Sequence, residues 1–418
     1  MFFLVDANSF YVSCEAVFDP AIRNRPVVVL TNNDGQICAA NRQAKALNIS
    51  KFAPYFKVKE LCKLHNVVVK SSNYELYADL SNKMMNVIGR FAHDQYIYSI
   101  DESFLRLTNY HQIIDDLHAY GTKIRRTVYK ETRLPVCVGV APTPTLAKAA
   151  NNMAKKLARF RGVIVINDEQ TRKDLLSQMP VADVWGVGRK ISARLKLNNI
   201  HTALDLANWP VGLARKEFNI EVERTVRELN GEQCMSWEEV RAPKKQIFST
   251  RSFGNRVTKR HELQQALNEH VSIAVRKLRK QSSLVRYMTM FASSSPHDES
   301  PTYRRAFHRF VSPTNDTSIV MQALSDAMDS LFVKNVRYYR VGIGLIDLVD
   351  QKFLQGDLFN PSQDNYKLMD CLDSINHRFG DNTLQFASQG FDKKWAMRRQ
   401  FMSPKYTTNW ADIPKIKC

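Results

Sequence analysis

Residues 98–105, YSIDESFL, place two adjacent carboxylates, Asp101 and Glu102, in an otherwise apolar stretch. The flanking segments YIYSI (96–100) and SFLRL (103–107) are rich in β-forming residues, so the sequence predicts a hairpin with an acidic tip. Charge at the mouth of two buried strands needs either water or a partner. A solvated turn is one interpretation, and a site where other groups meet the acids is the other.

A third carboxylate, Asp6, ends the apolar segment MFFLV (1–5). If this strand neighbours the hairpin, Asp6, Asp101 and Glu102 meet at one edge of a sheet. Three carboxylates repel one another unless cations lie between them, and an oxygen-only site suits Mg²⁺. Two such ions, about 4 Å apart, support phosphoryl transfer. Asp6 could instead cap the helix predicted at 9–18, and spacing alone does not decide.

Basic side chains also recur at helical spacing. Lys148 and Lys155 are seven residues apart, on one helix face, and Arg42 and Lys45 are three apart on an earlier predicted helix. Either pair can bind a triphosphate through point charges or forked donors. Solvated helix faces are the competing interpretation.

The chain of 418 residues is too long for one hydrophobic core, so we expect several domains. Strands and helices alternate through residue 166, which predicts an α/β unit. Residues 167–235 read as helical, and 242–350 mix strands and helices again. Besides the hairpin, the predicted strands are 1–5, 26–30, 136–140 and 162–166, and the predicted helices are 9–18, 38–47, 73–92, 113–132 and 145–159.

The net charge of +19 is concentrated, because residues 241–310 hold fifteen Lys or Arg against four Asp or Glu. Such a block favours contacts with nucleic acid phosphates over a merely solvated face. The seven cysteines form no CxxC pair, and neither a signal peptide nor a membrane-length apolar run is present. We therefore expect a cytoplasmic protein with reduced thiols and no membrane segment.

The stretch 183–206 contains Gly186–Val187–Gly188 between two predicted helices. Backbone N–H groups at such a hairpin and at the following helix N-terminus can bind a phosphate oxygen without reading the base sequence. The pattern resembles a helix-hairpin-helix DNA-binding motif.

Taken together, these motifs resemble the Y-family translesion DNA polymerases over nearly the whole chain. The C-terminal stretches QGDLF (355–359), QFASQG (385–390) and SPKYTT (403–408) point to the UmuC-type branch, the catalytic subunits of bacterial DNA polymerase V. The other stretches that carry the resemblance are DANSFYVSCE (6–15), VVVLTNNDG (27–35), ANRQAKALNI (40–49), SSNYELYADLSN (71–82), YSIDESF (98–104), VGVAPTPTLAKAANNMAKK (138–156), VWGVGRKISARL (184–195) and STRSFG (249–254).

The resemblance implies an α/β multidomain, right-hand polymerase fold. It implies a ferredoxin-like palm (1–10 and 75–166), small fingers (11–74), a helical thumb with a helix-hairpin-helix (167–237), an α/β little finger (242–350) and a C-terminal region for the clamp and partners (351–418). The activity implied is error-prone synthesis across damaged template DNA in the SOS response.

The resemblance also implies roles for single residues. Asp6, Asp101, Glu102 and the carbonyl of Ala7 would hold two Mg²⁺ ions. Tyr11 would pack against the sugar of the incoming dNTP and exclude ribonucleotides, although the neighbouring ring of Phe10 is an alternative. The other implied contacts are Arg42, Lys45 and Lys155 to the triphosphate, Gly186, Gly188, Arg251 and Arg256 to primer–template DNA, and Gln355, Leu358 and Phe359 to the sliding clamp.

Two protein partners are implied only by the resemblance: a cleaved UmuD-type dimer and a RecA-type recombinase filament. Three positions depart from the usual family pattern. Ser103 replaces an alanine, Pro144 replaces a lysine, which removes one phosphate contact, and Gly356 replaces a leucine, which weakens the expected clamp motif.

Two other function classes compete with a polymerase. A different two-metal enzyme, such as a nuclease or a nucleotide cyclase, would use the same acids, but the hairpin tip lacks the glycines that a palm-type cyclase needs. A non-catalytic DNA-binding scaffold would keep the fold without the chemistry, yet all three acids are present. Primer extension with Mg²⁺ distinguishes the three classes.

Overall fold

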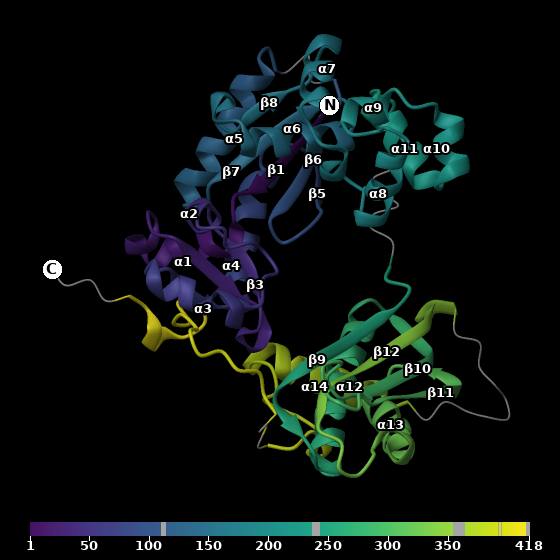
Figure 1. The fold of residues 1–418 in the computed structure, drawn as a ribbon. Coiled ribbons are helices and arrows are strands. Elements are labelled where there is room, and N and C mark those ends of the chain that lie inside the picture. The colour runs from purple at the N-terminus through teal and green to yellow at the C-terminus, as the bar shows by residue number, and fades with distance from the viewer. Residues whose placement is uncertain (110–113, 236–242, 354–363, 392, 394, 415–418) are drawn as a thin grey trace. The chain divides into compact units, whose positions relative to one another are not determined.

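The computed structural model describes residues 1–109, 114–235, 243–353, 364–391, 393 and 395–414 (Figure 1). The chain divides into two compact units. Unit 1 comprises residues 1–241 together with 400–418, and unit 2 comprises residues 242–399. Among the described residues, no helix combines the length and the apolar character needed to span a bilayer.

The centre of unit 1 is a five-stranded sheet in the order β5-β6-β1-β7-β8. Strand β1 is antiparallel to both of its neighbours, β6 and β7, and β7 is parallel to β8. The antiparallel pairing of β5 with β6 confirms the predicted hairpin. The strands are β1 (Phe2–Ala7), β5 (Asp94–Ile97), β6 (Glu102–Arg106), β7 (Val136–Ala141) and β8 (Val163–Val165).

Alternate residues of β1 face two different cores. Phe3 and Val5 pack in a cluster with helices α1 (Phe10–Phe18), α4 (Tyr74–Gly89) and α5 (Leu117–Thr132). Phe2 and Leu4 pack with α6 (Pro144–Lys156) and the thumb helices on the other side of the sheet. Because strand side chains alternate between faces, Asp6 belongs to the α6 side.

A second sheet of unit 1, in the order β3-β2-β4, forms the fingers. Its strands are β2 (Val27–Leu30), β3 (Ile37–Ala40) and β4 (Val68–Ser71), and its helices are α2 (Arg42–Ala46) and α3 (Tyr55–Leu64). The predicted helix at 38–47 is therefore wrong in its first half. Residues 37–40 pair with β2, and the Asn41 side chain then accepts a hydrogen bond from the Ala44 amide (2.9 Å) and caps a short helix.

The thumb is helical throughout its described residues, as predicted. It comprises α7 (Glu169–Ser177), α8 (Arg189–Leu197), α9 (Ala203–Ala207), α10 (Val211–Glu217) and α11 (Ile220–Leu229). The element before the glycine hairpin is only a 3₁₀ turn, Val181–Asp183, where the sequence predicts a helix end. Gly186 has φ +86°, a conformation that other residues rarely adopt, and Gly188 precedes α8 in an extended conformation.

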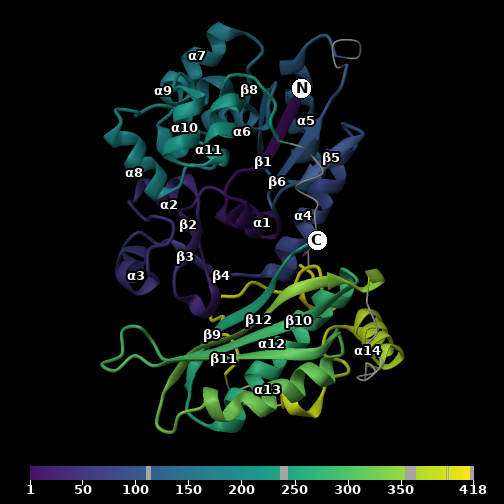
Figure 2. The same ribbon diagram turned by 90° about the vertical axis from the view of Figure 1, so that its right-hand side faces the viewer.

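Unit 2 is built on a four-stranded sheet in the order β11-β10-β12-β9 (Figure 2). Helices α12 (Arg260–Lys280) and α13 (Thr317–Leu331) pack on one face of this sheet, which is the predicted α/β architecture. The strands are β9 (Ile247–Val257), β10 (Ser283–Ser293), β11 (Tyr303–Thr314) and β12 (Tyr338–Asp350).

The region expected as one C-terminal tail, 351–418, is divided between the two units. Helix α14 (Tyr366–Phe379) belongs to unit 2. The described residues 400–414, which we call the C-terminal segment, belong to unit 1 and lie against the fingers and α1. This division depends on apolar contacts and hydrogen bonds between residues that lie hundreds of positions apart in the sequence. A local sequence pattern could therefore not reveal it.

Candidate active site

The pairing of β1 with β6 brings two of the predicted acids together. Asp6 lies directly opposite Glu102 in the antiparallel register. Side chains paired in this way point to the same face of a sheet. Asp6 is therefore not the cap of the following helix, whose N-cap residue is Ser9.

Helix α6 supplies a cation to each of these acids. Lys155 forms an ion pair with Asp6, and the Lys148 ammonium lies 3.1 Å from a carboxylate oxygen of Glu102. The spacing of seven therefore places both lysines on one helix face, as predicted. The helix approaches the sheet closely at Gly139, where a Cβ atom would collide with the Ala147 carbonyl oxygen.

Burial dominates the electrostatics of Asp6, whose residue is only 7% exposed. Desolvation raises the pKa of Asp6 to about 7, although the nearby Lys155 ammonium opposes that shift. A hydrogen bond with the Glu102 carboxyl contributes to this raised pKa. Two adjacent carboxyl groups at one edge of the sheet, each with a lysine beside it, form a site where positive charge is stabilised.

Asp101 adjoins this pair through its backbone. Its carbonyl oxygen accepts a hydrogen bond from the Ala7 amide (3.0 Å), whereas its carboxylate accepts one from the Ser99 hydroxyl (2.6 Å). Burial raises the pKa of Tyr11, on the α1 side of the sheet, to about 12, and the charge of Asp101 makes a smaller contribution in the same direction. No three His, Cys, Asp or Glu side chains within the described ranges gather closely enough to hold a metal ion, so the three-acid site stays a prediction.

Tyr11 lies on the first turn of α1, and its ring is half-buried. It stacks on Tyr77 at a centroid distance of 4.6 Å and meets Tyr74 edge-on at 6.1 Å. Phe10, the alternative ring, is only 3% exposed and packs in the core. Of the two rings, that of Tyr11 is thus the more exposed, and its contact with the sugar stays a prediction.

The predicted phosphate ligands come from two elements. Lys155 already lies at the acids, on α6, while Arg42 and Lys45 lie on α2 of the fingers with exposed side chains. The structure places all three in unit 1, but only Lys155 contacts an acid.

Two aromatic residues that the sequence analysis missed hold Lys148. The Lys148 ammonium lies 4.3 Å from the ring centroid of Tyr98 and 4.9 Å from that of Trp185. The indole N–H of Trp185 also donates to the Tyr98 hydroxyl (3.2 Å). Tyr98 belongs to the connection between β5 and β6, and Trp185 directly precedes Gly186 of the thumb. The cluster therefore joins the β5–β6 hairpin, α6 and the thumb. In the sequence, this cluster is indicated only by the positions of its rings, with Tyr98 near Asp101 and Trp185 next to the glycine hairpin.

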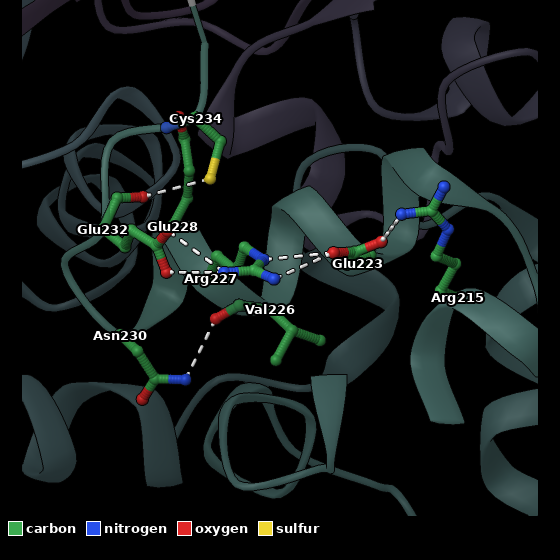
Figure 3. Close-up of polar contacts among 8 residues, drawn as sticks. All are labelled: Arg215, Glu223, Val226, Arg227, Glu228, Asn230, Glu232 and Cys234. Atoms are coloured by element: carbon green, nitrogen blue, oxygen red, sulfur yellow. Dashed lines mark hydrogen bonds and ion pairs between the residues drawn. The ribbon is translucent and has the colours of Figure 1, made fainter. Parts of the chain in front are cut away.

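A buried carboxylate, Glu228, lies on α11 among other polar side chains of the thumb (Figure 3). It connects the thumb to α6. One of its oxygens accepts hydrogen bonds from the amide and hydroxyl of Thr145, at the start of α6. The other accepts from the amides of Cys234 (3.2 Å) and Met235 (3.0 Å), after α11. Glu228 therefore satisfies backbone donors at both a helix N-terminus and the chain that leaves the thumb.

Replacing Glu228 with glutamine should destabilise the protein by about 2 kcal/mol or more. The NH₂ group of the glutamine would replace one carboxylate oxygen and would face N–H donors that then have no acceptor. For a unit of this size, thermal unfolding should begin at least about 4 °C lower. Glu217→Gln, on the exposed end of α10, makes the same chemical change and should leave the unfolding temperature unaltered. Equal unfolding temperatures for the two variants would show that Glu228 does not connect these elements.

In unit 2, the two predicted DNA contacts lie in different surroundings. Arg256 forms a two-fold ion pair with Asp298, with both N···O distances at 3.1 Å. Arg251 pairs with Val341, a core residue, so it lies on the sheet face that α12 covers. We call the opposite face of the sheet the open face. Arg256 precedes the core residue Val257, and its guanidinium lies 4.9 Å from the ring centroid of the exposed Tyr339.

The open face carries other arginines next to aromatic rings. Arg305 stacks on Phe307 at 4.2 Å, and Arg309 and Arg340 lie 5.7 Å from the rings of Tyr287 and Phe291. These strand residues alternate with the core residues of β10, β11 and β12. Period-two alternation was visible in the sequence, but which face the helices cover was not. The predicted clamp residues Gln355, Leu358 and Phe359 lie outside the described residues.

Comparison with known families finds three matching models. The impB/mucB/samB family matches residues 5–152, and the C-terminal domain of that family matches residues 244–358. A third model, described only as a domain of unknown function (DUF4113), matches residues 366–416. Together, the three models cover most of both units.

Several known proteins are similar to this chain in sequence. The chain is 43% identical to Protein UmuC of Salmonella typhimurium over the full length of both chains. It is 41% identical to Protein MucB of Escherichia coli over 99% of each chain. It is also 27% identical to DNA polymerase IV of Bacillus velezensis over 92% of this chain and 91% of that protein.

Solved structures share the fold. A Y-family DNA polymerase chimera of Dbh and Dpo4 superimposes with a TM-score of 0.66 at 19% identity, over 84% of this chain and 99% of the chimera. An insertion ternary complex of Dbh DNA polymerase superimposes with a TM-score of 0.55 over the same shares. The fold expected from the sequence motifs is thereby confirmed.

Proposed function

This chain belongs to the impB/mucB/samB family, and from that membership and its site we propose that it is a template-directed DNA polymerase that extends primers across damaged DNA. The observation that carries the proposal is the register that pairs Asp6 with Glu102, with Lys155 and Lys148 beside them. A DNA polymerase IV relative and the shared Y-family fold support the same reaction class.

In this reaction, the 3′-hydroxyl oxygen of the primer bonds to the α-phosphorus of a dNTP, and pyrophosphate leaves. Asp6 and Glu102, with Asp101, would hold Mg²⁺, which neutralises charge on the attacking and leaving oxygens. The donor set fits this ion, because Asp6 and Glu102 present carboxylate oxygens side by side, and Mg²⁺ prefers oxygen ligands. For Asp101 to join, its carboxylate would leave the Ser99 hydroxyl and turn towards the other two acids.

The chain's other residues would position the nucleotide. Lys155, which pairs with Asp6 in this structure, would donate to a phosphate oxygen of the nucleotide. Arg42 and Lys45, exposed on α2, would bind the distal phosphates. Tyr11 would pack against the deoxyribose and leave no space for a 2′-hydroxyl.

Primer extension by the purified full chain with Mg²⁺ and the four dNTPs tests this proposal. Extension supports a polymerase, cleavage of the DNA supports a nuclease, and binding without either reaction supports a scaffold. Because we also propose that a cleaved UmuD-type dimer, a RecA-type filament and the sliding clamp activate the chain in the SOS response, each reaction is repeated with these proteins added.

We propose that the open face of unit 2 contacts the DNA backbone. Its arginines are held by aromatic rings and point away from the core, and the region around them carries more than half of the net charge. Such contacts release counterions, so DNA affinity should fall steeply as salt rises.

Replacing Arg305 and Arg309 with glutamine should reduce the slope of log affinity against log salt by about 0.9 for each phosphate that the variant no longer binds. The matched control is Lys277→Gln, an exposed cation on α12, on the helix-covered side of the sheet. Fluorescence anisotropy of labelled primer–template DNA over a range of salt concentrations gives both slopes. Equal slopes for the double variant and the control would remove the open face from the DNA interface.

A further inference from the structure

The C-terminal segment (400–414) packs against strand β4 of the fingers and against helix α1. The Phe401 amide donates to the Ser71 hydroxyl (2.9 Å), and the Ser71 amide donates to the Phe401 carbonyl (3.0 Å), which extends the edge of β4. Tyr406 stacks on Phe18 of α1, with ring centroids 4.7 Å apart and planes within 9°. Residues more than 300 positions apart in sequence therefore form one surface.

Ser403 lies at the centre of this contact and is only 3% exposed. Its hydroxyl donates to Oε1 of Glu15 (3.2 Å) and accepts from the side-chain amide of Asn73 (3.0 Å). Glu15 is 1% exposed, and the same oxygen also accepts from the Tyr77 hydroxyl (2.7 Å). In the described structure no lysine, arginine or histidine forms an ion pair with Glu15, so hydroxyl donors satisfy this oxygen.

Tyr77 connects this buried carboxylate to the candidate sugar-binding ring. Its hydroxyl is fixed by Glu15, and its ring lies against that of Tyr11, tilted by 21°. Stacking alone allows two rings to slide, whereas a hydrogen bond to a buried carboxylate fixes the position of one ring. Ser403, Glu15, Tyr77 and Tyr11 thus form a continuous series of contacts.

We propose that Ser403 and Glu15 are positioning residues for the Tyr11 ring, so that the C-terminal segment sets how strictly the polymerase rejects ribonucleotides. The proposal rests on the role proposed for Tyr11. It also suggests a function for part of residues 366–416, the region that the model described as a domain of unknown function matches.

The test measures the ratio of incorporation efficiencies for paired deoxy- and ribonucleoside triphosphates. Ser403→Ala should lower this selectivity about two- to tenfold, which is the range expected when one hydrogen bond to a charged or polar partner is removed. Tyr77→Phe removes the next hydroxyl but keeps the ring, and it should produce a similar decrease. Thr408→Ala, an exposed hydroxyl in the same segment, should leave the ratio unchanged.

Combining Ser403→Ala with Tyr11→Ala separates this proposal from the proposed role of Tyr11. If Ser403 acts through the ring, the double variant should be no less selective than Tyr11→Ala alone. A normal ratio in both Ser403→Ala and Tyr77→Phe, with Tyr11→Ala impaired, would overturn the positioning role only. A parallel loss of both efficiencies at a constant ratio would also overturn it, whereas a normal ratio in Tyr11→Ala would overturn the role of Tyr11 itself.

Discussion

Glu102→Gln is expected to lower the rate of nucleotide incorporation by about a thousandfold or more while primer–template affinity stays nearly constant. The amide keeps the size of the side chain but removes the charge opposite Asp6, and with it a ligand for Mg²⁺. Loss of several kcal/mol of transition-state stabilisation corresponds to at least this factor. Single-turnover incorporation with a saturating dNTP measures the rate, and anisotropy measures the affinity.

Glu131→Gln is the matched control, because Glu131 lies on α5 of the same unit and its exposed side chain pairs with Arg90 at the surface. It should incorporate nucleotides at the normal rate. Asp101→Asn tests the third acid, whose carboxylate accepts a hydrogen bond from the Ser99 hydroxyl in this structure. A normal rate in Glu102→Gln would contradict the metal-site assignment, and a normal rate in Asp101→Asn alone would limit the site to two acids.

Tyr11→Ala should admit ribonucleotides and lower deoxy-over-ribo selectivity by about two to four powers of ten. The reason is steric, since the ring fills the space that a 2′-hydroxyl needs, and a clash of a few kcal/mol corresponds to such a factor. Deoxynucleotide incorporation should continue at reduced efficiency, because the acids and phosphate ligands are unchanged. The measurement is the ratio of kcat/KM values for each pair of nucleotides.

Phe10→Leu is the control for this prediction. Phe10 is buried in the core, so leucine removes the neighbouring ring but keeps most of the packed volume. Its selectivity should remain normal even if the protein is less stable. Collapse of selectivity in Phe10→Leu, with Tyr11→Ala normal, would mean that the wrong ring is assigned.

Much of the architecture could be predicted from local pattern. The hairpin around Asp101, the long helix ending at Gly89 and the apolar strand before Asp6 all occur where their periodicity places them. The failure at 38–47 is informative, because residues 37–40 form a strand through pairing with β2. Pairing with a distant strand overrides a weak helical preference.

The sequence alone determined the kinds of chemistry that are available: carboxylates at strand ends, lysines on one helix face, a glycine hairpin and a block of positive charge. Each follows from residue type and spacing within a few turns or a single strand. Only the tertiary structure decided which of them meet. The register of β1 with β6 pairs Asp6 with Glu102, while the Asp101 carboxylate accepts a hydrogen bond from the Ser99 hydroxyl instead. In unit 2, the register of β9 with β12 places Arg251 on the face that the helices cover. Likewise, Ser403 reaches Glu15 across 388 positions, because strand register and long-range packing depend on the whole chain, which no local pattern records.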